Sequence, residues 1–348
     1  MSEILIYGAN GYTGALAAEH ALTLGLRPVL AGRDPERLRP LGERLGLPWR
    51  AFPLDAPARL REGLSGIAAV LHAAGPFSAT SRPMADACLA AGAHYVDITG
   101  EIAVLEALAA RDAEARSAGV ALLPAAGFDV VPSDCLAAHV AGRLPGATHL
   151  RISIGGFGGF SRGTARTMAE GIAWGTRVRR DGRIVELPQP PRGSADFGQG
   201  PRRTVGLGWG DVSTAWYATG VPNIDVYFEA FPAMAAAAGL PAGIRRVIAG
   251  GTAQRLIGRV IDRLPRGPTA PQRAAARAYF LAEAWDGSGN RAASRLTTAE
   301  GYTLTVWTAL ETARRAAAGT VAPGFHTPAT AFGPDFILGF PGVTRTDL

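Results

Sequence analysis

The chain has 348 residues, 47% of them hydrophobic, and a formal net charge of +6. This length predicts two domains, and the apolar content with 45 glycines is typical of a compact α/β enzyme rather than a disordered chain. All 35 basic residues are arginines, which excludes a lysine Schiff base, a phosphate-loop lysine and a lysine acid or base. The modest charge is expected to be spread along the chain. It suits an anionic cofactor or substrate, and no basic motif interleaved with aromatic residues indicates nucleic acid.

Targeting and metal signals are missing from the sequence. There is no cationic segment followed by a long apolar run, and no clean stretch of about 18 apolar residues that could span a bilayer. The two cysteines, Cys88 and Cys135, lie on predicted helices and imply no disulfide framework, so a cytoplasmic protein with reduced thiols is expected. No His, Cys and Asp cluster has metal-ligand spacing, and no metal is expected.

The first predicted strand, Ile4–Tyr7, leads directly into three glycines at G-x-x-G-x-x-G spacing and then into a helix-forming run. In a dinucleotide-binding βαβ unit, Gly8 would allow the tight turn, Gly11 the approach of a pyrophosphate, and Gly14 the close packing of helix on strand. The N-terminus of the new helix would stabilise the phosphate charge. The cofactor-binding residues predicted from this turn are Gly8, Asn10, Gly11, Tyr12, Thr13 and Gly14.

The second predicted strand, Arg27–Gly32, ends at Arg33 and Asp34. The residue at this strand end faces the adenosine ribose, where a carboxylate binds the 2′-hydroxyl of NAD and an arginine accommodates the 2′-phosphate of NADP. Arg33 therefore predicts NADP(H). Asp34 is better explained as the N-cap of a helix over Pro35–Leu45.

Strands and helices continue to alternate through the first 145 residues. Strands are expected at Trp49–Leu54, Ala68–Ala74, His94–Thr99 and Val120–Ala125, and helices near Pro57–Leu64, Ser81–Ala91 and Ala103–Ala118. Such alternation predicts a Rossmann-type, doubly wound parallel sheet with helices on both faces. Ligands bind outside the carboxyl ends of its strands.

Three of these carboxyl ends carry distinctive residues. Small residues after the fourth strand would let a nicotinamide ribose lie against the backbone, with Phe77 as an apolar wall, whereas His72 is expected to be a packed strand residue. Asp97 lies near the end of the fifth strand and Glu101 directly beyond it, and Asp129 follows the sixth. The residues added to the predicted cofactor site are Asp55, Ala74, Gly75, Pro76 and Phe77.

Together these motifs resemble the saccharopine dehydrogenase-like oxidoreductases, and more closely their trans-acting enoyl reductase branch. The resemblance rests on Gly8–Gly14, Ala31–Arg33, Gly75–Phe77, Tyr95–Glu101 and Gly127–Asp134, with a weaker match at Thr327–Gly333. It implies an NADP-binding domain, a second domain that holds the substrate, and a C-terminal segment that returns to the first. It does not imply saccharopine as substrate, because the catalytic lysine of true saccharopine dehydrogenases has no counterpart here.

The second half predicts an α+β domain with a mixed sheet. Strands are expected at His149–Gly155, Ser213–Thr219, Asn223–Phe231, Ala278–Asp286 and Tyr302–Leu310, helices at Arg162–Arg179 and Glu311–Ala318, and a loop at Leu187–Arg203. A free edge of this sheet favours a homodimer. The predicted domains are 1–145 for NADP, 146–322 for substrate and dimerisation, and 323–348 for the returning segment.

Residues 244–264 place apolar side chains at helical spacing among arginines. Such a basic amphipathic helix can lie on an anionic membrane surface or form a lid over a lipophilic substrate. An ordinary domain helix with a solvated arginine face is the preferred interpretation. Gly250 and Gly251 weaken the helix under every interpretation.

Reduction by NADPH needs a proton donor beside the acceptor. The catalytic candidates are Glu101, Asp97 and Asp129, although Asp97 and Asp129 can instead serve to hydrogen-bond loop N–H groups. Tyr217 and Tyr227 of the second domain are alternative donors. The leading function is reduction of a C=C bond in an acyl or lipid-like small molecule. Alternatives are C=N reduction, a non-catalytic NADP-binding scaffold or redox sensor, and acyl-phosphate reduction, which needs a nucleophilic cysteine beside a histidine.

Overall fold

The computed structural model describes residues 3–156, 159, 161–162, 176–230, 243–244, 248, 250–261, 263, 265 and 267–348. They form two compact units, each with its own sheet. Unit 1 comprises Met1–Val131 and Tyr302–Phe332, and unit 2 comprises Pro132–Gly301 and Gly333–Leu348. Among the residues described, no helix is long and apolar enough to cross a membrane.

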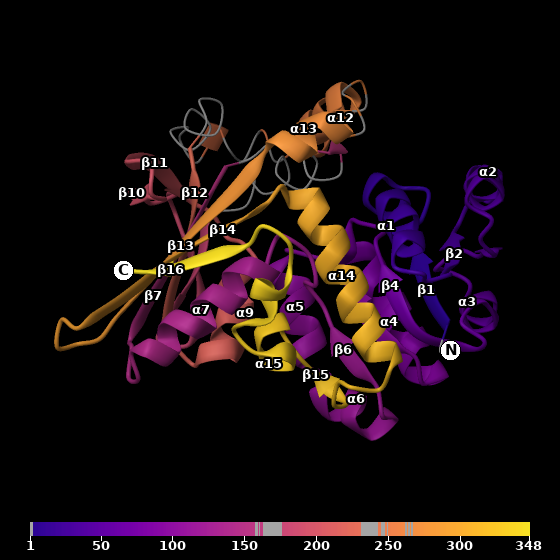
Figure 1. Ribbon diagram of the computed structural model, residues 1–348, viewed down its shortest axis with the longest axis horizontal. Helices are drawn as coiled ribbons and strands as arrows, with labels where there is room; N and C mark the ends of the chain where they lie inside the picture. Colours follow the sequence, from indigo (N-terminus) through magenta and orange to yellow (C-terminus); the bar gives the residue numbers. More distant parts are fainter. Residues whose placement is uncertain are drawn as a thin grey trace. The chain divides into compact units, whose positions relative to one another are not determined.

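Unit 1 is built on a seven-stranded sheet in the order β15-β6-β5-β4-β1-β2-β3, and every strand pair is parallel (Figure 1). This arrangement confirms the predicted Rossmann-type sheet. The strands are β1 (Glu3–Tyr7), β2 (Val29–Gly32), β3 (Trp49–Ala51), β4 (Ile67–His72), β5 (His94–Asp97), β6 (Ala121–Leu123) and β15 (Gly324–Phe325).

Helices cover both faces of this sheet. In the apolar core of one face, helices α1, α2 and α14 contribute Ala17, Leu38 and Leu310. In the core of the other face, helices α3, α4 and α5 contribute Leu60, Met84 and Leu108. The helices are α1 (Tyr12–Thr23), α2 (Pro35–Leu45), α3 (Pro57–Gly63), α4 (Phe77–Ala91), α5 (Ile102–Ala109), α6 (Asp112–Ala118), α14 (Gly301–Ala317) and α15 (Pro328–Phe332).

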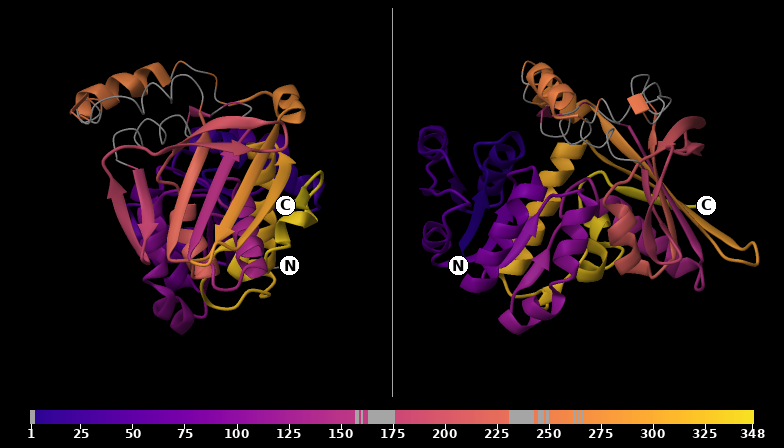
Figure 2. Two further views of the ribbon diagram at one scale, coloured as in Figure 1. Left: turned by 90° about the vertical axis from the view of Figure 1, so that its left-hand side faces the viewer. Right: turned by 180° about the vertical axis from the view of Figure 1, so that it is seen from behind.

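Unit 2 is built on a mixed sheet in the order β10-β11-β12-β7-β13-β14-β16, with β8 and β9 off this path (Figure 2, left). Strands β12 and β7 are parallel, whereas β7–β13 and β13–β14 are antiparallel, which confirms the predicted mixed sheet. The strands are β7 (His149–Gly155), β8 (Thr176–Arg180), β9 (Arg183–Leu187), β10 (Arg192–Asp196), β11 (Pro201–Gly206), β12 (Asn223–Glu229), β13 (Arg277–Trp285), β14 (Arg291–Ala299) and β16 (Thr344–Asp347).

The helices of unit 2 include α9, which packs against β8 and β12. On β7 the fully buried Leu150, Ile152 and Ile154 alternate with more polar residues, so one face of the strand belongs to the core. The helical segments are α7 (Val131–Arg143), α9 (Asp211–Thr219), α12 (Gly251–Ile261), α13 (Ala270–Ala275) and the short 3₁₀ helix Phe336–Gly339.

Three predicted elements of the second half are wrong. The predicted strands Ser213–Thr219 and Tyr302–Leu310 are helical, within α9 and α14, and the predicted loop Leu187–Arg203 contains β10 and the start of β11. Of the predicted helix Arg162–Arg179, residues 163–175 lie outside the described part, and the following residues form β8.

The division into units differs from the predicted boundaries at 145 and 322. Helix α7 belongs to unit 2, where His139 lies 2.8 Å from Asp347 and Arg143 donates to the carbonyl of Ala293 on β14. The segment 323–348 is shared, because β15 extends the sheet of unit 1 and β16 that of unit 2.

Candidate functional site

The glycine turn lies at the carboxyl end of β1. Gly8 has a φ of +86°, and a Cβ atom there would lie 2.9 Å from the Cβ of Ala74, so the turn packs directly against the segment after β4. At Gly14 an added Cβ would lie 2.3 Å from the carbonyl oxygen of Gly8. Only glycine fits either position. The turn therefore has the close backbone packing of a dinucleotide-binding turn.

Helix α1 begins directly after this turn. Its N-cap, Gly11, provides no side chain to cap the helix, and the first turn, which includes Tyr12 and Thr13, has no acidic residue. The positive end of the helix dipole therefore lies at the turn, where an anionic phosphate is stabilised. The side-chain oxygen of Asn10 lies beside Gly32 of β2, 3.2 Å from where a Cβ would stand.

Arg33 follows β2 directly and is exposed. Burial raises the pKa of the neighbouring Tyr7 to about 12, with opposing contributions from the charges of Arg33 and Asp55, so the structure brings these three residues together. The carboxylate of Asp34 accepts a hydrogen bond of 3.0 Å from the backbone N–H of Glu36, which confirms Asp34 as the N-cap of α2. Arg33 therefore lies at the end of β2, the position for which the sequence predicts contact with a 2′-phosphate.

Glu101 caps the helix that follows β4. Its two carboxylate oxygens accept hydrogen bonds of 2.8 Å from the backbone N–H groups of Phe77 and Ser78, at the start of α4. The negative charge also lies at the positive end of this helix. Both oxygens are used in holding the Gly75–Phe77 segment, whose Gly75–Pro76 peptide bond is cis.

Asp97 is fully buried, and its carboxylate accepts three hydrogen bonds. The donors are the hydroxyl of Tyr95 at 2.6 Å and the N–H groups of Thr99 and Ala125, both at 2.9 Å. Burial raises the pKa of Asp97 to about 6, against the lowering effect of these bonds. The group therefore joins the ends of β5 and β6, and both of its oxygens accept hydrogen bonds from the fold.

Asp129 lies in the loop after β6 and is half-buried. Desolvation raises the pKa of its carboxyl group to about 7. Helix α14 supports this loop, since the hydroxyl of Thr305 accepts from the N–H of Phe128 at 2.9 Å and the hydroxyl of Thr308 donates to the carbonyl of Ala126 at 2.7 Å. Asp129 thus combines a raised pKa with a side chain that is not fully buried.

Helix α14 also contributes to the site next to the glycine turn. The ring of Tyr302 meets that of Tyr12 edge-on, with centroids 5.0 Å apart. Tyr302, Thr305 and Thr308 are not among the predicted site residues, because the sequence of this segment favours a strand. The available signal was the spacing of three and four residues between Thr305, Thr308 and Thr312, which places their buried side chains on one helical face.

His72 is a packed strand residue, as predicted. It is fully buried, and its Nε2 lies 3.0 Å from the hydroxyl of Thr80, which in turn donates to the carbonyl of Ala74 at 2.7 Å. Burial lowers the pKa of His72 to about 3, so the ring is neutral. These two hydrogen bonds hold the segment between β4 and α4 in place.

Within the described residues, the cysteines and the metal-ligating residue types form no further reactive cluster. Both Cys88 and Cys135 are buried, and burial raises the pKa of each thiol, so neither is set up as a thiolate nucleophile. Among the residues that the structure describes, no three His, Cys, Asp or Glu side chains gather as metal ligands.

Comparison with known proteins gives matches to the first part of the chain. Residues 4–123 match the family model described as the saccharopine dehydrogenase NADP binding domain. The chain therefore contains an NADP-binding domain of this type, and the resemblance drawn from its motifs is confirmed.

The curated relatives include mycobacterial proteins. A trans-acting enoyl reductase of Mycobacterium ulcerans is 34% identical over 146 residues, which cover 40% of this chain and 35% of that protein. A Mycobacterium tuberculosis protein, whose name gives the same activity provisionally, is 36% identical over 182 residues, covering 48% of this chain and 43% of its own. Each match spans less than half of the relative.

Among solved structures, apo saccharopine dehydrogenase (L-Glu forming) from Saccharomyces cerevisiae matches over 100% of both chains with a TM-score of 0.66. At 10% sequence identity this likeness shows the fold alone.

Proposed function

We propose that this chain, whose first unit carries a saccharopine dehydrogenase NADP-binding domain, is an NADPH-dependent reductase of a C=C bond in an acyl or lipid-like substrate. The observation that carries the proposal is the glycine turn packed against Ala74, with the uncapped N-terminus of α1 and Arg33 at the same edge of the sheet. The names of the mycobacterial relatives support the enoyl-type reaction.

The residues at this edge fit the proposed cofactor. Gly8, Gly11 and Gly14 would let a pyrophosphate approach the backbone, and Arg33 would bind the 2′-phosphate of the adenosine ribose. The segment Ala74–Phe77, held by Glu101, would line the nicotinamide ribose. When bound, the reduced nicotinamide supplies the hydride that one carbon of the double bond accepts.

The other carbon of the double bond must receive a proton. Asp129 is the proposed donor, because desolvation keeps part of its carboxyl group protonated near pH 7. Asp97 and Glu101 are better explained as positioning residues, since each accepts hydrogen bonds that hold strand ends or a helix start in place. They maintain the shape of the edge at which the reaction would occur.

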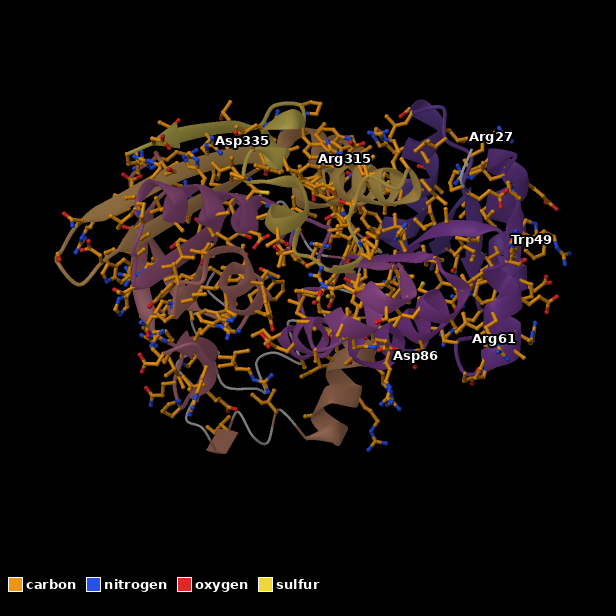
Figure 3. All side chains as sticks on the ribbon, turned by 90° about the horizontal axis from the view of Figure 1, so that it is seen from below. Arg27, Trp49, Arg61, Asp86, Arg315 and Asp335 are labelled. Atoms are coloured by element: carbon orange, nitrogen blue, oxygen red, sulfur yellow. The ribbon has the colours of Figure 1, made fainter. Side chains whose placement is uncertain are left out.

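Cofactor binding is tested by fluorescence titration with NADPH and NADH. We expect wild type to prefer NADPH and Arg33→Ala to lose that preference, with NADPH binding weakened by roughly 10- to 100-fold through loss of a charge-assisted bidentate contact. Arg61→Ala is the matched control, because Arg61 is an exposed arginine on α3 of the same unit (Figure 3). A wild type that binds neither nucleotide would refute the proposal.

Turnover is tested with α,β-unsaturated acyl thioesters, by following the loss of NADPH absorbance. A donor with a pKa of about 7 is protonated below that pH, so kcat/KM is expected to fall as the pH rises through 7. Asp129→Asn should lower kcat by roughly 10²- to 10⁴-fold and remove this dependence. Glu101→Gln keeps an acceptor oxygen for the start of α4, so this variant should retain the wild-type pH dependence of kcat/KM. Tight NADPH binding without turnover on any substrate would favour the non-catalytic scaffold instead.

A further inference from the structure

The basic surplus of the chain is concentrated in one segment, contrary to the even spread expected from the composition. Residues 230–282 contain eight arginines and a single acidic residue, Asp262, which gives this segment a net charge of +7. Because the whole chain carries +6, all other residues together sum to −1. A cluster of this size adjoining an amphipathic helix is typical of segments that bind anionic lipid surfaces.

Helix α12 lies within this segment and has two distinct faces. Ile261 is buried at 6% exposure and Ile257, one turn earlier, is half-buried, so these two mark the inward side. Leu256 and Val260, also one turn apart, are exposed at 63% and 59%. Their neighbours Arg255 and Arg259 are exposed as well. The outward side thus presents a row of aliphatic side chains beside a row of guanidinium groups.

These aliphatic side chains are exceptional within the described part of the chain. Leu256 and Val260 have the highest exposure of any large hydrophobic residue there, and Ile244, at 48%, precedes them on the same segment. An exposed aliphatic row costs hydration free energy, which is recovered when the row leaves water. This exposure argues against the ordinary domain helix preferred from the sequence, in which the apolar positions would face the core.

We propose that the outward face of α12 docks on the surface of a lipid bilayer that contains anionic phospholipid. The helix would lie in the plane of the surface, with Leu256 and Val260 entering the boundary between headgroups and acyl chains. Arg255 and Arg259 would bind lipid phosphates, for which the guanidinium fork is well suited.

The chemistry of the face favours lipid over an acidic protein partner. Binding sites for proteins are enriched in tryptophan, tyrosine and arginine, and their central residues are commonly aromatic. Residues 232–278 contain no aromatic residue at all, only aliphatic and basic side chains beside small and polar ones. This composition matches an interfacial helix, which needs apolar insertion and positive charge but no specific pocket.

The experiment is flotation of the full-length chain with vesicles of phosphatidylcholine alone or mixed with phosphatidylglycerol. Wild type should float only with the mixed vesicles, and high salt should weaken the binding. Arg255→Gln/Arg259→Gln should reduce partitioning by roughly 10-fold or more. Leu256→Ser/Val260→Ser should reduce it by a similar factor while leaving the fold intact, because both side chains are already exposed.

Two matched variants act as controls. Arg37→Gln/Arg39→Gln removes the same charge from α2 of unit 1, where the two side chains are 72% and 52% exposed. Leu24→Ser/Leu348→Ser removes two other exposed leucines, at 51% and 53%. Both should float like wild type, and circular dichroism should be unchanged for all four variants.

Equal loss of flotation in the arginine control would mean a general charge effect and would overturn the assignment to α12. Absence of wild-type binding to mixed vesicles would also overturn it. Binding of an acidic amphipathic peptide through α12, without binding to vesicles, would assign the face to a protein partner instead. Flotation requires neither cofactor nor substrate, so its outcome is independent of whether the reductase proposal succeeds.

Discussion

Asp97 illustrates how a carboxylate at the mouth of a sheet can serve the fold rather than the chemistry. It is fully buried and accepts hydrogen bonds from Tyr95, Thr99 and Ala125. Asp97→Asn places an amide N–H₂ group against one or two of these donors. Because an unsatisfied buried group costs about 1–3 kcal/mol, we expect the free energy of unfolding in urea to fall by that amount.

The control for this substitution is Asp34→Asn. Asp34 makes the same kind of contact, a side-chain oxygen accepting from a backbone N–H, but it does so at the exposed N-cap of α2, where asparagine caps nearly as well. The free energy of unfolding of the Asp34→Asn variant should differ from that of wild type by only a few tenths of a kcal/mol. If Asp97→Asn proved equally mild while abolishing turnover, Asp97 would have to be returned to the list of catalytic candidates.

Elements of the first unit could be predicted because their signals are local. A buried strand, a glycine turn and an amphipathic helix each follow from a few consecutive residues, as at Ile4–Gly14. Helix α14 could not be predicted in this way, since β-branched and aromatic residues such as Thr303, Val306 and Trp307 favour strands. Its helical state depends on packing of Ala309, Leu310 and neighbouring residues into the core of unit 1.

The residues of the candidate site likewise differ in whether their roles can be predicted from local sequence. The glycines and Arg33 could be assigned from their order along the chain, because the geometry they need is set by adjacent residues. The roles of Glu101 and Thr308 could not, since each depends on a backbone group that is distant in sequence, at Phe77 and Ala126 respectively. Sequence locates such polar residues at the correct sheet edge without showing which atoms they bind.

Gly14 provides a test of the turn between β1 and α1. In Gly14→Ala the new methyl group would lie 2.3 Å from the carbonyl oxygen of Gly8, so the turn must shift. We expect a loss of about 1–3 kcal/mol in the free energy of unfolding, as for other overpacked sites. NADPH affinity should fall more than roughly tenfold, because the displaced turn would misplace the phosphate-binding backbone. Urea unfolding and fluorescence titration measure the two effects.

Gly142→Ala is the matched control, since Gly142 lies in α7 with nothing within 4 Å of the added carbon. Alanine stabilises a helix relative to glycine, and the free energy of unfolding should rise by about 0.5–1 kcal/mol with NADPH binding unchanged. Wild-type affinity in Gly14→Ala would show that the close packing of the turn is irrelevant to the cofactor.

At the scale of the whole chain, unit 1 is discontinuous in sequence. Its sheet is covered on one face by α14, whose Val306, Leu310 and Ala313 pack in the same core as Ile4 and Leu71. A fragment of residues 1–145 lacks this helix and leaves that core open. We expect it to aggregate or to bind a hydrophobic dye such as ANS.

A fusion of residues 1–131 to 302–332 through a flexible linker contains every element of unit 1. It should remain monodisperse in size-exclusion chromatography and bind NADPH. A monodisperse fragment 1–145 with full NADPH affinity would instead show that α14 is dispensable for the first unit.

The same discontinuity determines when the unit can be completed on the ribosome. The ribosome adds 170 residues between Val131, the last residue of the unit's first part, and Tyr302, the first residue of its second part. At about 5–20 residues per second, the nascent sheet waits roughly 10–35 s for the helix that covers it. During that interval its apolar face is available to chaperones such as those at the exit tunnel. The yield of folded chains is therefore expected to depend on the order in which the parts of unit 1 are synthesised.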